Sequence, residues 1–330
     1  MNQMFTIDRA TNNGTAVSLT LRVTARRVVG EDIEEFTFAA ADGAQLPDWQ
    51  PGAHVEFKLP LATGTESRSY SLLGDPADRS QYRIAVLRQD QGQGGSVWMH
   101  DEALVGSVIT AVGPRNAFVF EPARQYLFVA GGIGITPLLP MIAQAERENT
   151  PWQLVYLVRQ ESRFAYAREL RQYPADKLQM HASMEPTFDL KAALDNLPDG
   201  TAVQACGPVP LLNALEKFAA AADGRWTLSV ERFAAPVLGA GEGSFEIALA
   251  RSNKVLQVAA DKSILEVLRA EGIAVESSCR SGTCGTCECG VLEGAIDHRD
   301  QVLTAGERAD GKSMMVCVSR AAGNRLVLDI

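Results

Sequence analysis

The sequence is poor in basic residues, in histidine and in long apolar segments. It holds 31 Lys and Arg against 40 Asp and Glu, so the formal net charge is −9 and a nucleic-acid partner is not expected. Residues 125–145 carry no charge, but Gly and Pro interrupt them five times, so we expect a buried strand, a loop and a helix there and no membrane span. Residues 1–15 are polar, lack the apolar core of a signal peptide, and are expected to be flexible.

The remaining composition is that of an ordinary globular protein, with 46% apolar and 22% charged residues. At 330 residues the chain is long enough for two or three domains, each with its own core. No internal repeat or low-complexity segment is present in the sequence. Because nothing in the sequence demands an oligomer, we expect a monomer.

Four of the six cysteines follow a pattern that is typical of iron–sulfur proteins. Cys279, Cys284 and Cys287 have the spacing C-x4-C-x2-C, and Cys317 comes after 29 intervening residues. This is the plant-type ligand order for a [2Fe–2S] cluster. Small residues between the first three cysteines would let the backbone wrap around a cluster, and glycine also adopts backbone angles closed to other residues.

Two other uses of these cysteines agree less well with the spacing. Structural zinc sites usually contain two C-x2-C pairs, and this chain has one. A disulfide framework is also a poor explanation, because one loop holds Cys279, Cys284, Cys287 and Cys289, which are four of the six cysteines. Cys289 falls outside the ligand pattern and is expected to be a free thiol. Because cluster thiolates suit a reducing compartment, we expect a cytoplasmic protein.

Residues from about 16 to 120 are predicted to form an antiparallel β-barrel or sandwich. Short runs rich in Val, Ile, Phe, Tyr and Thr alternate with turn signals such as Pro51-Gly52 and Gly113-Pro114. The expected strands are 17–25, 34–38, 54–59, 67–72, 82–86 and 108–112.

Two short stretches in this region are candidates for binding a flavin. In the strand Arg68-Ser69-Tyr70-Ser71-Leu72, alternation puts Arg68, Tyr70 and Leu72 on one face and the serines on the other. The loop Gly92–Ser96, with sequence GQGGS, precedes an amphipathic stretch, and its backbone N–H groups could hold a phosphate. Each stretch alone is more often a plain strand or a plain turn. Together they indicate a flavin phosphate site with Tyr70 near the ring.

From Arg124 onward, strands alternate with helices. The expected strands are 126–130, 153–158, 177–181, 201–205 and 227–230. The expected helices are 137–148, 164–172, 190–194 and 209–221. This alternation predicts a parallel, doubly wound α/β sheet.

Two glycine-containing turns follow strands of this predicted sheet. The turn GGIGITP runs from Gly131 to Pro137, with Thr136 as a helix N-cap and Pro137 as the first helical residue. The turn Cys206-Gly207-Pro208 follows a later strand. Because ligands bind such sheets at the carboxyl ends of the strands, both turns should line one crevice. The alternatives are a tight turn without a ligand, and a buried core thiol at Cys206.

The carboxyl-terminal part is predicted to be a small α+β ferredoxin-like unit. Strands 245–249 and 255–258 form a hairpin, and Ser263 with Glu266 forms a capping box that opens a helix, which Gly272 can end. Further strands are expected at 291–295, 314–318 and 325–330. Residues 234–243 show neither a charge pattern nor periodicity and are interpreted as a linker.

The order of these parts resembles the phthalate dioxygenase reductase family, which includes vanillate demethylase reductases. The likeness covers residues 17–330 and is carried by the stretches above, by Met315–Arg320 and by Asp297-His298-Arg299-Asp300. It implies three domains, which are a flavin-binding antiparallel β-barrel (1–122), a Rossmann-like NAD-binding α/β domain (123–233) and, after the linker 234–243, a β-grasp [2Fe–2S] ferredoxin domain (244–330).

The resemblance also implies roles for individual residues. The residues expected to contact the flavin ring, its ribityl chain or its phosphate are Arg68, Ser69, Tyr70, Ser71, Ala85, Val86, Leu87, Gln93, Gly94, Gly95 and Ser96. The residues expected to place the nicotinamide are Gly131, Gly132, Gly134, Thr136, Pro137, Cys206, Gly207 and Pro208. Thr136 and Phe233 are also expected to approach the flavin from the α/β domain, with Phe233 near the isoalloxazine. The residues expected to shape the site of hydride transfer are Tyr70, Ser71, Thr136, Cys206 and Phe233.

One departure from the family concerns the phosphate loop. Relatives often place a cation beside the loop glycines, where this chain has Gln93. More of the phosphate charge would therefore fall on Arg68 and on backbone N–H groups. FMN is expected as the flavin, with FAD as the alternative.

By resemblance, the chain is an NADH-dependent reductase that passes electrons from NADH through FMN to the cluster and on to a Rieske-type terminal oxygenase. A hydride carries two electrons and the cluster accepts one, so a flavin is needed between them. Glu161 would repel the 2′-phosphate that Arg163 could meet, which favours NADH over NADPH. The alternatives are a reductase for a P450, a diiron oxygenase or free flavin, and a ferredoxin-type carrier without hydride chemistry of its own.

Overall fold

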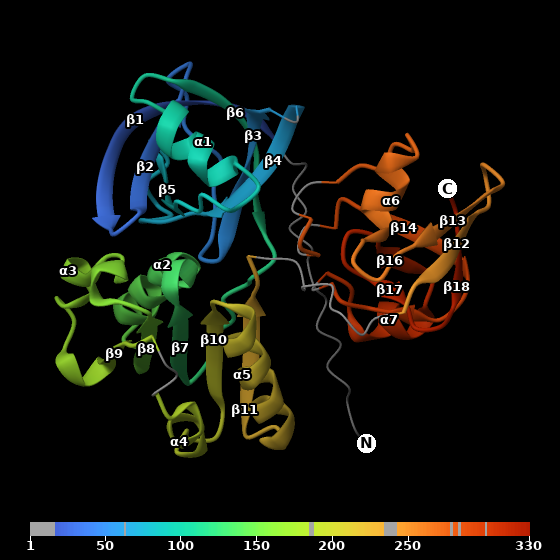
Figure 1. The fold of residues 1–330 in the computed structure, drawn as a ribbon. Coiled ribbons are helices and arrows are strands. Elements are labelled where there is room, and N and C mark those ends of the chain that lie inside the picture. Colours follow the sequence, from blue (N-terminus) through green and yellow to red (C-terminus); the bar gives the residue numbers. More distant parts are fainter. Residues whose placement is uncertain are drawn as a thin grey trace, which may run out of the picture.

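The chain folds into a β-barrel, an α/β unit and a small carboxyl-terminal unit (Figure 1). The computed structural model describes residues 17–62, 64–184, 188–233, 243–277, 280–282, 285–300 and 302–330. The predicted ligands Cys279 and Cys284, the predicted linker except Gly243, and the first 16 residues lie outside the described residues. Among the helices that are described, none has the length and apolar character needed to cross a bilayer.

The barrel is a six-stranded antiparallel sheet with the order β4-β3-β6-β1-β2-β5. Its elements are β1 Ser18–Gly30, β2 Ile33–Ala40, β3 Ala53–Leu61, β4 Gly64–Ser71, β5 Tyr82–Leu87, α1 Gly95–Glu102 and β6 Val108–Asn116. Each of the six predicted strands is present. Aromatic side chains fill the core, with the rings of Phe38 and Phe57 5.0 Å apart.

The α/β unit is a parallel five-stranded sheet with the order β11-β10-β7-β8-β9, as predicted. Its elements are β7 Gln125–Gly131, α2 Ile135–Arg147, β8 Trp152–Val158, α3 Ala167–Leu170, β9 Leu178–Ala182, α4 Leu190–Asp195, β10 Thr201–Cys206, α5 Val209–Ala221 and β11 Trp226–Glu231, with 3₁₀ turns at Gly132–Gly134, Glu161–Arg163 and Ala175–Lys177. From β7 the chain moves outward to β8 and β9, then returns to β10 on the other side of β7. The sheet order therefore reverses between β7 and β10, and ligand sites form at such a point.

Two helix predictions in this unit are wrong. Thr136 is not an N-cap, because the 3₁₀ turn leads directly into α2 and the cap position is Gly134, while the Thr136 hydroxyl donates to the Ile133 carbonyl at 2.9 Å. The helix predicted over 164–172 is only α3. Tyr166 has a left-handed φ of 59°, and its N–H donates to the Val29 carbonyl of the barrel at 3.2 Å. Because residues 164–166 contact the barrel in this way, they are not part of the helix.

The carboxyl-terminal unit is a mixed sheet with the order β13-β12-β18-β14-β16 and helices packed beside it. Its elements are β12 Phe245–Leu249, β13 Lys254–Val258, α6 Ile264–Ala270, β14 Glu288–Glu293, β15 Ile296–Asp297, α7 Ala305–Asp310, β16 Ser313–Met315, β17 Arg320–Ala321 and β18 Arg325–Leu328. The predicted capping box of Ser263 and Glu266 is present at the start of α6. The strand predicted over 314–318 is wrong in part, because Val318 and Ser319 both donate to the Met315 carbonyl and turn the chain at Cys317.

Candidate active site

A cradle suited to an anion lies at the amino end of α1. Gly94 is the N-cap in a left-handed conformation with φ 79°, and no side chain caps the first N–H groups of the helix. The Arg68 guanidinium donates to the Gln93 carbonyl at 2.9 Å. A Cβ at Gly95 would come within 2.7 Å of Arg68 Cγ, so glycine lets the arginine lie against the loop. Uncapped helical N–H groups beside a guanidinium form a site for a phosphate.

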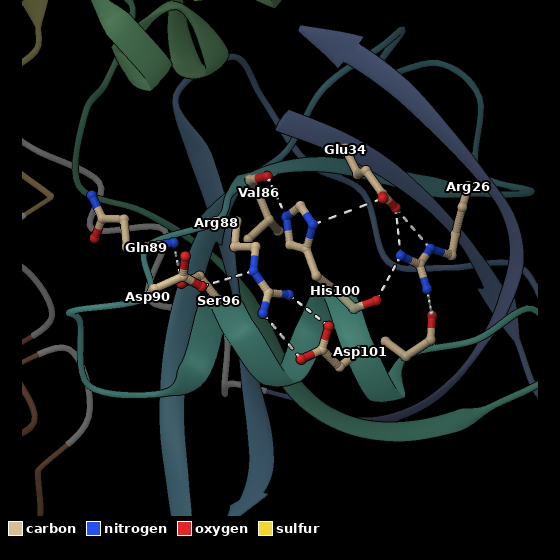
Figure 2. Close-up of polar contacts among 10 residues, drawn as sticks. Arg26, Glu34, Val86, Arg88, Gln89, Asp90, Ser96, His100 and Asp101 are labelled. Atoms are coloured by element: carbon tan, nitrogen blue, oxygen red, sulfur yellow. Dashed lines mark hydrogen bonds and ion pairs between the residues drawn. The ribbon is translucent and has the colours of Figure 1, made fainter. Parts of the chain in front are cut away.

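A polar network holds α1 on the barrel (Figure 2). His100 Nε2 lies 2.9 Å from the Val86 carbonyl, and Nδ1 lies 3.8 Å from the Glu34 carboxylate. Arg26 pairs with Glu34 at 2.5 Å and donates to the His100 carbonyl at 2.7 Å near the carboxyl end of α1. These contacts come from β1, β2 and β5. They set the position of the helix whose amino end forms the cradle, and they give His100 a structural role.

The predicted phosphate residues Gln93, Gly94, Gly95 and Ser96 all lie at this cradle. Ser96 Oγ accepts a hydrogen bond from the Gln89 N–H at 3.0 Å, so its hydroxyl hydrogen is left to donate elsewhere. The site therefore offers one guanidinium, one hydroxyl and the backbone N–H groups of the helix start.

The serines of β4 carry polar atoms that suit a ligand. The Ser69 hydroxyl is buried and, within the described chain, meets no hydrogen-bond partner, whereas the buried Ser71 hydroxyl lies near the Glu231 carboxyl. A buried hydroxyl without a partner costs free energy, so the Ser69 hydroxyl suits a polar group of a ligand bound along β4. Tyr70 lies between the two serines, with its ring 5.9 Å from that of Phe57, and burial raises its pKa above the ordinary value. The phenol therefore stays neutral at physiological pH.

The other predicted flavin residues lie on β5, and they divide between two faces. Ala85 and Leu87 pack against the core cluster of the α/β unit. Val86 is buried in the barrel core, and its carbonyl is engaged by His100. Of the three, Ala85 and Leu87 are therefore better placed for a ligand between the barrel and the α/β unit.

The two predicted glycine turns of the α/β unit touch each other. Ala130 at the end of β7 is the register partner of Cys206 at the end of β10. A Cβ added at Gly134 would lie 2.2 Å from the Cys206 carbonyl oxygen, and one at Gly131 would lie 2.4 Å from Pro208 Cδ. The structure thus brings both turns together at the point where the sheet order reverses. Gly132 belongs to the same turn, and Gly207 approaches Gly131 backbone to backbone. Pro137 lies in the first turn of α2 but, contrary to the prediction, is not its first residue, because the helix already begins at Ile135.

An acidic residue that the sequence analysis missed lies in the same place. Glu231 ends β11, is the register partner of Cys206 and is only 8% exposed. Burial raises its pKa to about 8, and the nearby Ser71 hydroxyl of the barrel partly offsets that rise. Burial also raises the pKa of the Cys206 thiol. Burial therefore favours the neutral form of both groups. The signal in the sequence is a lone acid that ends an otherwise uncharged strand.

Phe233 and Thr136 complete the predicted set. Phe233 follows β11 by two residues and is 46% exposed, so its ring is available to stack on a planar ligand. Thr136 is 2% exposed, and its hydroxyl is committed to the Ile133 carbonyl. Of these two, Phe233 is the side chain that can reach a ligand directly.

The described part of the cysteine pattern is buried and tightly packed. Cys287 and Cys317 belong to one core cluster and are 2% and 6% exposed. Gly282 has a φ of 76°, and a Cβ there would lie 2.6 Å from Val318 Cγ2, next to Cys317. The loop therefore packs on the segment that carries the fourth predicted ligand. Cys289 lies in the same core cluster, and burial raises the pKa of its thiol to about 11.

Ion pairs and hydrogen bonds join the barrel to both other units. Tyr166 of the α/β unit donates to the buried Glu35 carboxylate of the barrel at 2.8 Å. Burial opposes ionisation of Glu35, but Arg27, Arg83 and Tyr166 together hold its pKa below the ordinary value. On the other side, Arg280 of the cysteine loop pairs with Glu66 of β4. The barrel thus contacts the α/β unit and the cysteine-containing unit at once.

Comparison with known proteins identifies relatives of the whole chain. Residues 247–322 match the model of the 2Fe-2S iron-sulfur cluster binding domain. The chain is 41% identical to the phenoxybenzoate dioxygenase subunit beta of Ectopseudomonas oleovorans over 319 residues, which covers 96% of this chain and 98% of the relative. It is 35% identical to the solved structure of phthalate dioxygenase reductase, with a TM-score of 0.70 and coverage of 95% and 98%. It is also 38% identical to an intact type IV self-sufficient cytochrome P450 monooxygenase, with a TM-score of 0.76, and spans 41% of that longer chain.

Proposed function

Because the chain belongs to the phthalate dioxygenase reductase family, we propose that it takes electrons from NADH through FMN to a plant-type [2Fe–2S] cluster and delivers them to a Rieske-type terminal oxygenase. It is an oxidoreductase, the reductase component of an oxygenase system, with flavin and iron–sulfur chemistry. The choice of NADH as donor, of FMN as the flavin and of a Rieske-type oxygenase as acceptor is the proposal.

The observation that carries the proposal is the central position of the barrel. The anion cradle, the unpaired Ser69 hydroxyl and the ion pair to the cysteine loop all lie on or beside β4 among the described residues, and Ser71 of β4 faces Glu231 of the α/β unit. Electron transfer from a two-electron donor through a flavin to a one-electron acceptor requires the flavin domain to lie between the other two units. When bound, the flavin supplies the conversion of a hydride into single electrons, and the protein supplies position and surroundings.

FMN fits the cradle better than FAD does. A terminal phosphate monoester carries up to two negative charges, and the site offers the Arg68 guanidinium, the start of α1 and the Ser96 hydroxyl. The Ser69 and Ser71 hydroxyls and the Tyr70 phenol line the strand that leads from this cradle toward the α/β unit. We assign the flavin phosphate to Gln93–Ser96 and the ring to the end of β4.

NADH is favoured over NADPH by the contacts of Arg163. Its guanidinium pairs with Asp32 of the barrel at 2.7 Å, and neighbouring Ser162 donates to Glu31. An arginine held by a carboxylate is less available to a 2′-phosphate. This supports the preference predicted from Glu161.

The nicotinamide crevice is formed by backbone more than by side chains. The glycines let the turns at Gly131–Gly134 and Cys206–Pro208 pack backbone against backbone. Gly132, where an added Cβ would meet nothing within 4 Å, leaves the main chain open to a dinucleotide. Burial raises the pKa of Glu231 and of Cys206, which disfavours an ionised acid beside the proposed site of hydride transfer. Phe233 can stack on a ring, and the crevice needs no side-chain acid or base. Cys279, Cys284, Cys287 and Cys317 are the residues we assign to the cluster.

The acceptor has a second candidate. The likeness to a self-sufficient P450 protein over 95% of this chain favours a haem acceptor as the alternative to a Rieske oxygenase. The two acceptors can be distinguished by mixing the reduced chain, under anaerobic conditions, with a purified Rieske oxygenase or with a purified P450 and measuring which of them is reduced.

We also propose a cytoplasmic monomer with the domain limits given above.

The test of the proposed function is an anaerobic titration of the purified protein with NADH. Flavin bleaching followed by the low-temperature EPR signal of a reduced [2Fe–2S] cluster is the expected result. Heat release of the flavin then distinguishes FMN from FAD, and an NADPH titration measures the nucleotide preference. A protein with a loaded cluster that binds no flavin, or that NADH does not reduce, would be a ferredoxin-type carrier and would refute the proposal.

A further inference from the structure

We propose that Glu66 and Arg115 of the barrel form the docking site for the cluster loop, and that Glu66 is a positioning residue for electron transfer out of the flavin. This role rests on the proposed function, since it concerns the step between flavin and cluster. It is carried by contacts between side chains far apart in the sequence. Glu66 and Arg280 are separated by 214 positions, and Arg115 and Thr286 by 171.

Two contacts tie the loop to the barrel near its ends. Arg280 directly follows the predicted ligand Cys279, and its guanidinium pairs with the Glu66 carboxylate. Thr286 directly precedes Cys287, and its hydroxyl accepts from the Arg115 guanidinium at 3.2 Å. A loop held beside its first and its third predicted ligand has little freedom to turn relative to the barrel.

The barrel side of this contact is prepared in advance. Arg115 on β6 lies 3.7 Å from the Glu56 carboxylate, which is 3% exposed and also pairs with Lys58. Glu66 is only 15% exposed and lies on the same strand as Arg68. Both docking side chains are therefore partly buried, where ion pairs are less screened than on an open surface.

Glu66 also links the loop to the anion cradle. Its carboxylate lies 3.8 Å from the Arg68 guanidinium, because residues two apart on a strand share a face. One carboxylate thus lies between the arginine of the cradle and the arginine of the cluster loop. Without it the two guanidinium groups face each other. Burial, and to a smaller extent the charge of Arg280, already lowers the pKa of Arg68, whereas the charge of Glu66 raises it. Glu66 is therefore the group that permits the loop to rest against this part of the barrel.

The test compares Glu66→Gln, Arg280→Gln and the double variant with the wild-type holoprotein in anaerobic stopped-flow with NADH. Flavin bleaching should change by less than about twofold, whereas the later cluster reduction should slow about tenfold in each single variant. The double variant should be no slower than the singles, because the two residues act as a pair. Glu66→Asp, which keeps the charge, should recover part of the rate.

A readout independent of turnover is hydrogen exchange of the peptide that contains Arg280. Exchange should become faster in Glu66→Gln, and added salt should speed it in the wild type but not in that variant. The matched control is Arg251→Gln, which breaks the exposed pair with Asp329 in the same unit and should leave both measurements unchanged.

The outcomes separate the two proposals. A wild-type protein whose flavin or cluster is not reduced by NADH refutes the proposed function. A wild-type protein that transfers electrons normally, with Glu66→Gln equal to it in cluster reduction and in exchange, refutes the docking role alone. Loss of flavin from Glu66→Gln with unchanged exchange would assign Glu66 to the cradle and would also overturn the docking role.

Discussion

Replacing Gly134 by Ala tests whether the two glycine turns hold the nicotinamide. Gly134 has φ −62° and ψ −4°, angles that alanine adopts freely, so the substitution adds no backbone strain. Its effect comes from one added methyl group. That Cβ would lie 2.2 Å from the Cys206 carbonyl oxygen and 2.5 Å from the carbonyl carbon.

The size of the effect follows from these distances. Cβ contacts under 3.0 Å are essentially never found, so the two turns must separate by roughly 1 Å, and the neighbour is backbone that cannot rotate away. Overpacking of this kind costs about 1–3 kcal/mol of stability. A misplacement of about 1 Å at a reacting centre slows a reaction about 100-fold. We therefore expect hydride transfer to fall by about two orders of magnitude while the protein remains folded.

The assay is anaerobic stopped-flow, with flavin bleaching by NADH as the signal and thermal unfolding as the check on folding. Reduction of the same protein by dithionite should be normal, since it does not use the crevice. Gly323→Ala is the matched control, because a Cβ there meets nothing within 4 Å. A folded Gly134→Ala protein that NADH bleaches at the wild-type rate would show that the nicotinamide does not bind between these turns.

Three further predictions concern single side chains. Burial raises the pKa of Glu231 to about 8, above its value in the unfolded chain. Its contribution to the free energy of unfolding is therefore fully present below about pH 4.5 and is lost as the pH rises toward 8, by roughly 1.4 kcal/mol per pH unit. The melting temperature of Glu231→Gln should lack this part of the fall with pH, and parallel curves of melting temperature against pH for the two proteins would contradict the assignment. Arg68→Gln removes a charge-assisted contact of about 1.5–3 kcal/mol and should weaken FMN retention about 10- to 100-fold, measured as flavin per protein after dialysis, whereas full retention would place the phosphate elsewhere. Cys317→Ser should abolish the [2Fe–2S] EPR signal, while Cys289→Ser, at a thiol that donates to the Gly290 carbonyl, should keep it; equal signals in both would remove Cys317 from the ligand set.

Much of the fold could be predicted because local interactions encode it. Apolar runs gave the six barrel strands, and the alternation of strands with helices gave the parallel sheet. The capping box at Ser263 was recognised, but the same pattern at Thr304 and Glu307, which opens α7, was not. The helix over 164–172 was overpredicted, because contacts of Tyr166 with the barrel prevailed over local propensity.

The sequence by itself determined the ligand spacing of the cysteines, the two glycine turns and the order of the three units, because each depends on residues close together in the chain. Only the tertiary structure decided that Glu231 is buried beside Cys206 with a raised pKa, and that Glu66 lies between Arg68 and Arg280. A shifted pKa depends on what surrounds a carboxyl group, and an ion pair across 214 positions leaves no periodic trace in the sequence. The surroundings of these carboxylates exist only once the three units are folded and in contact.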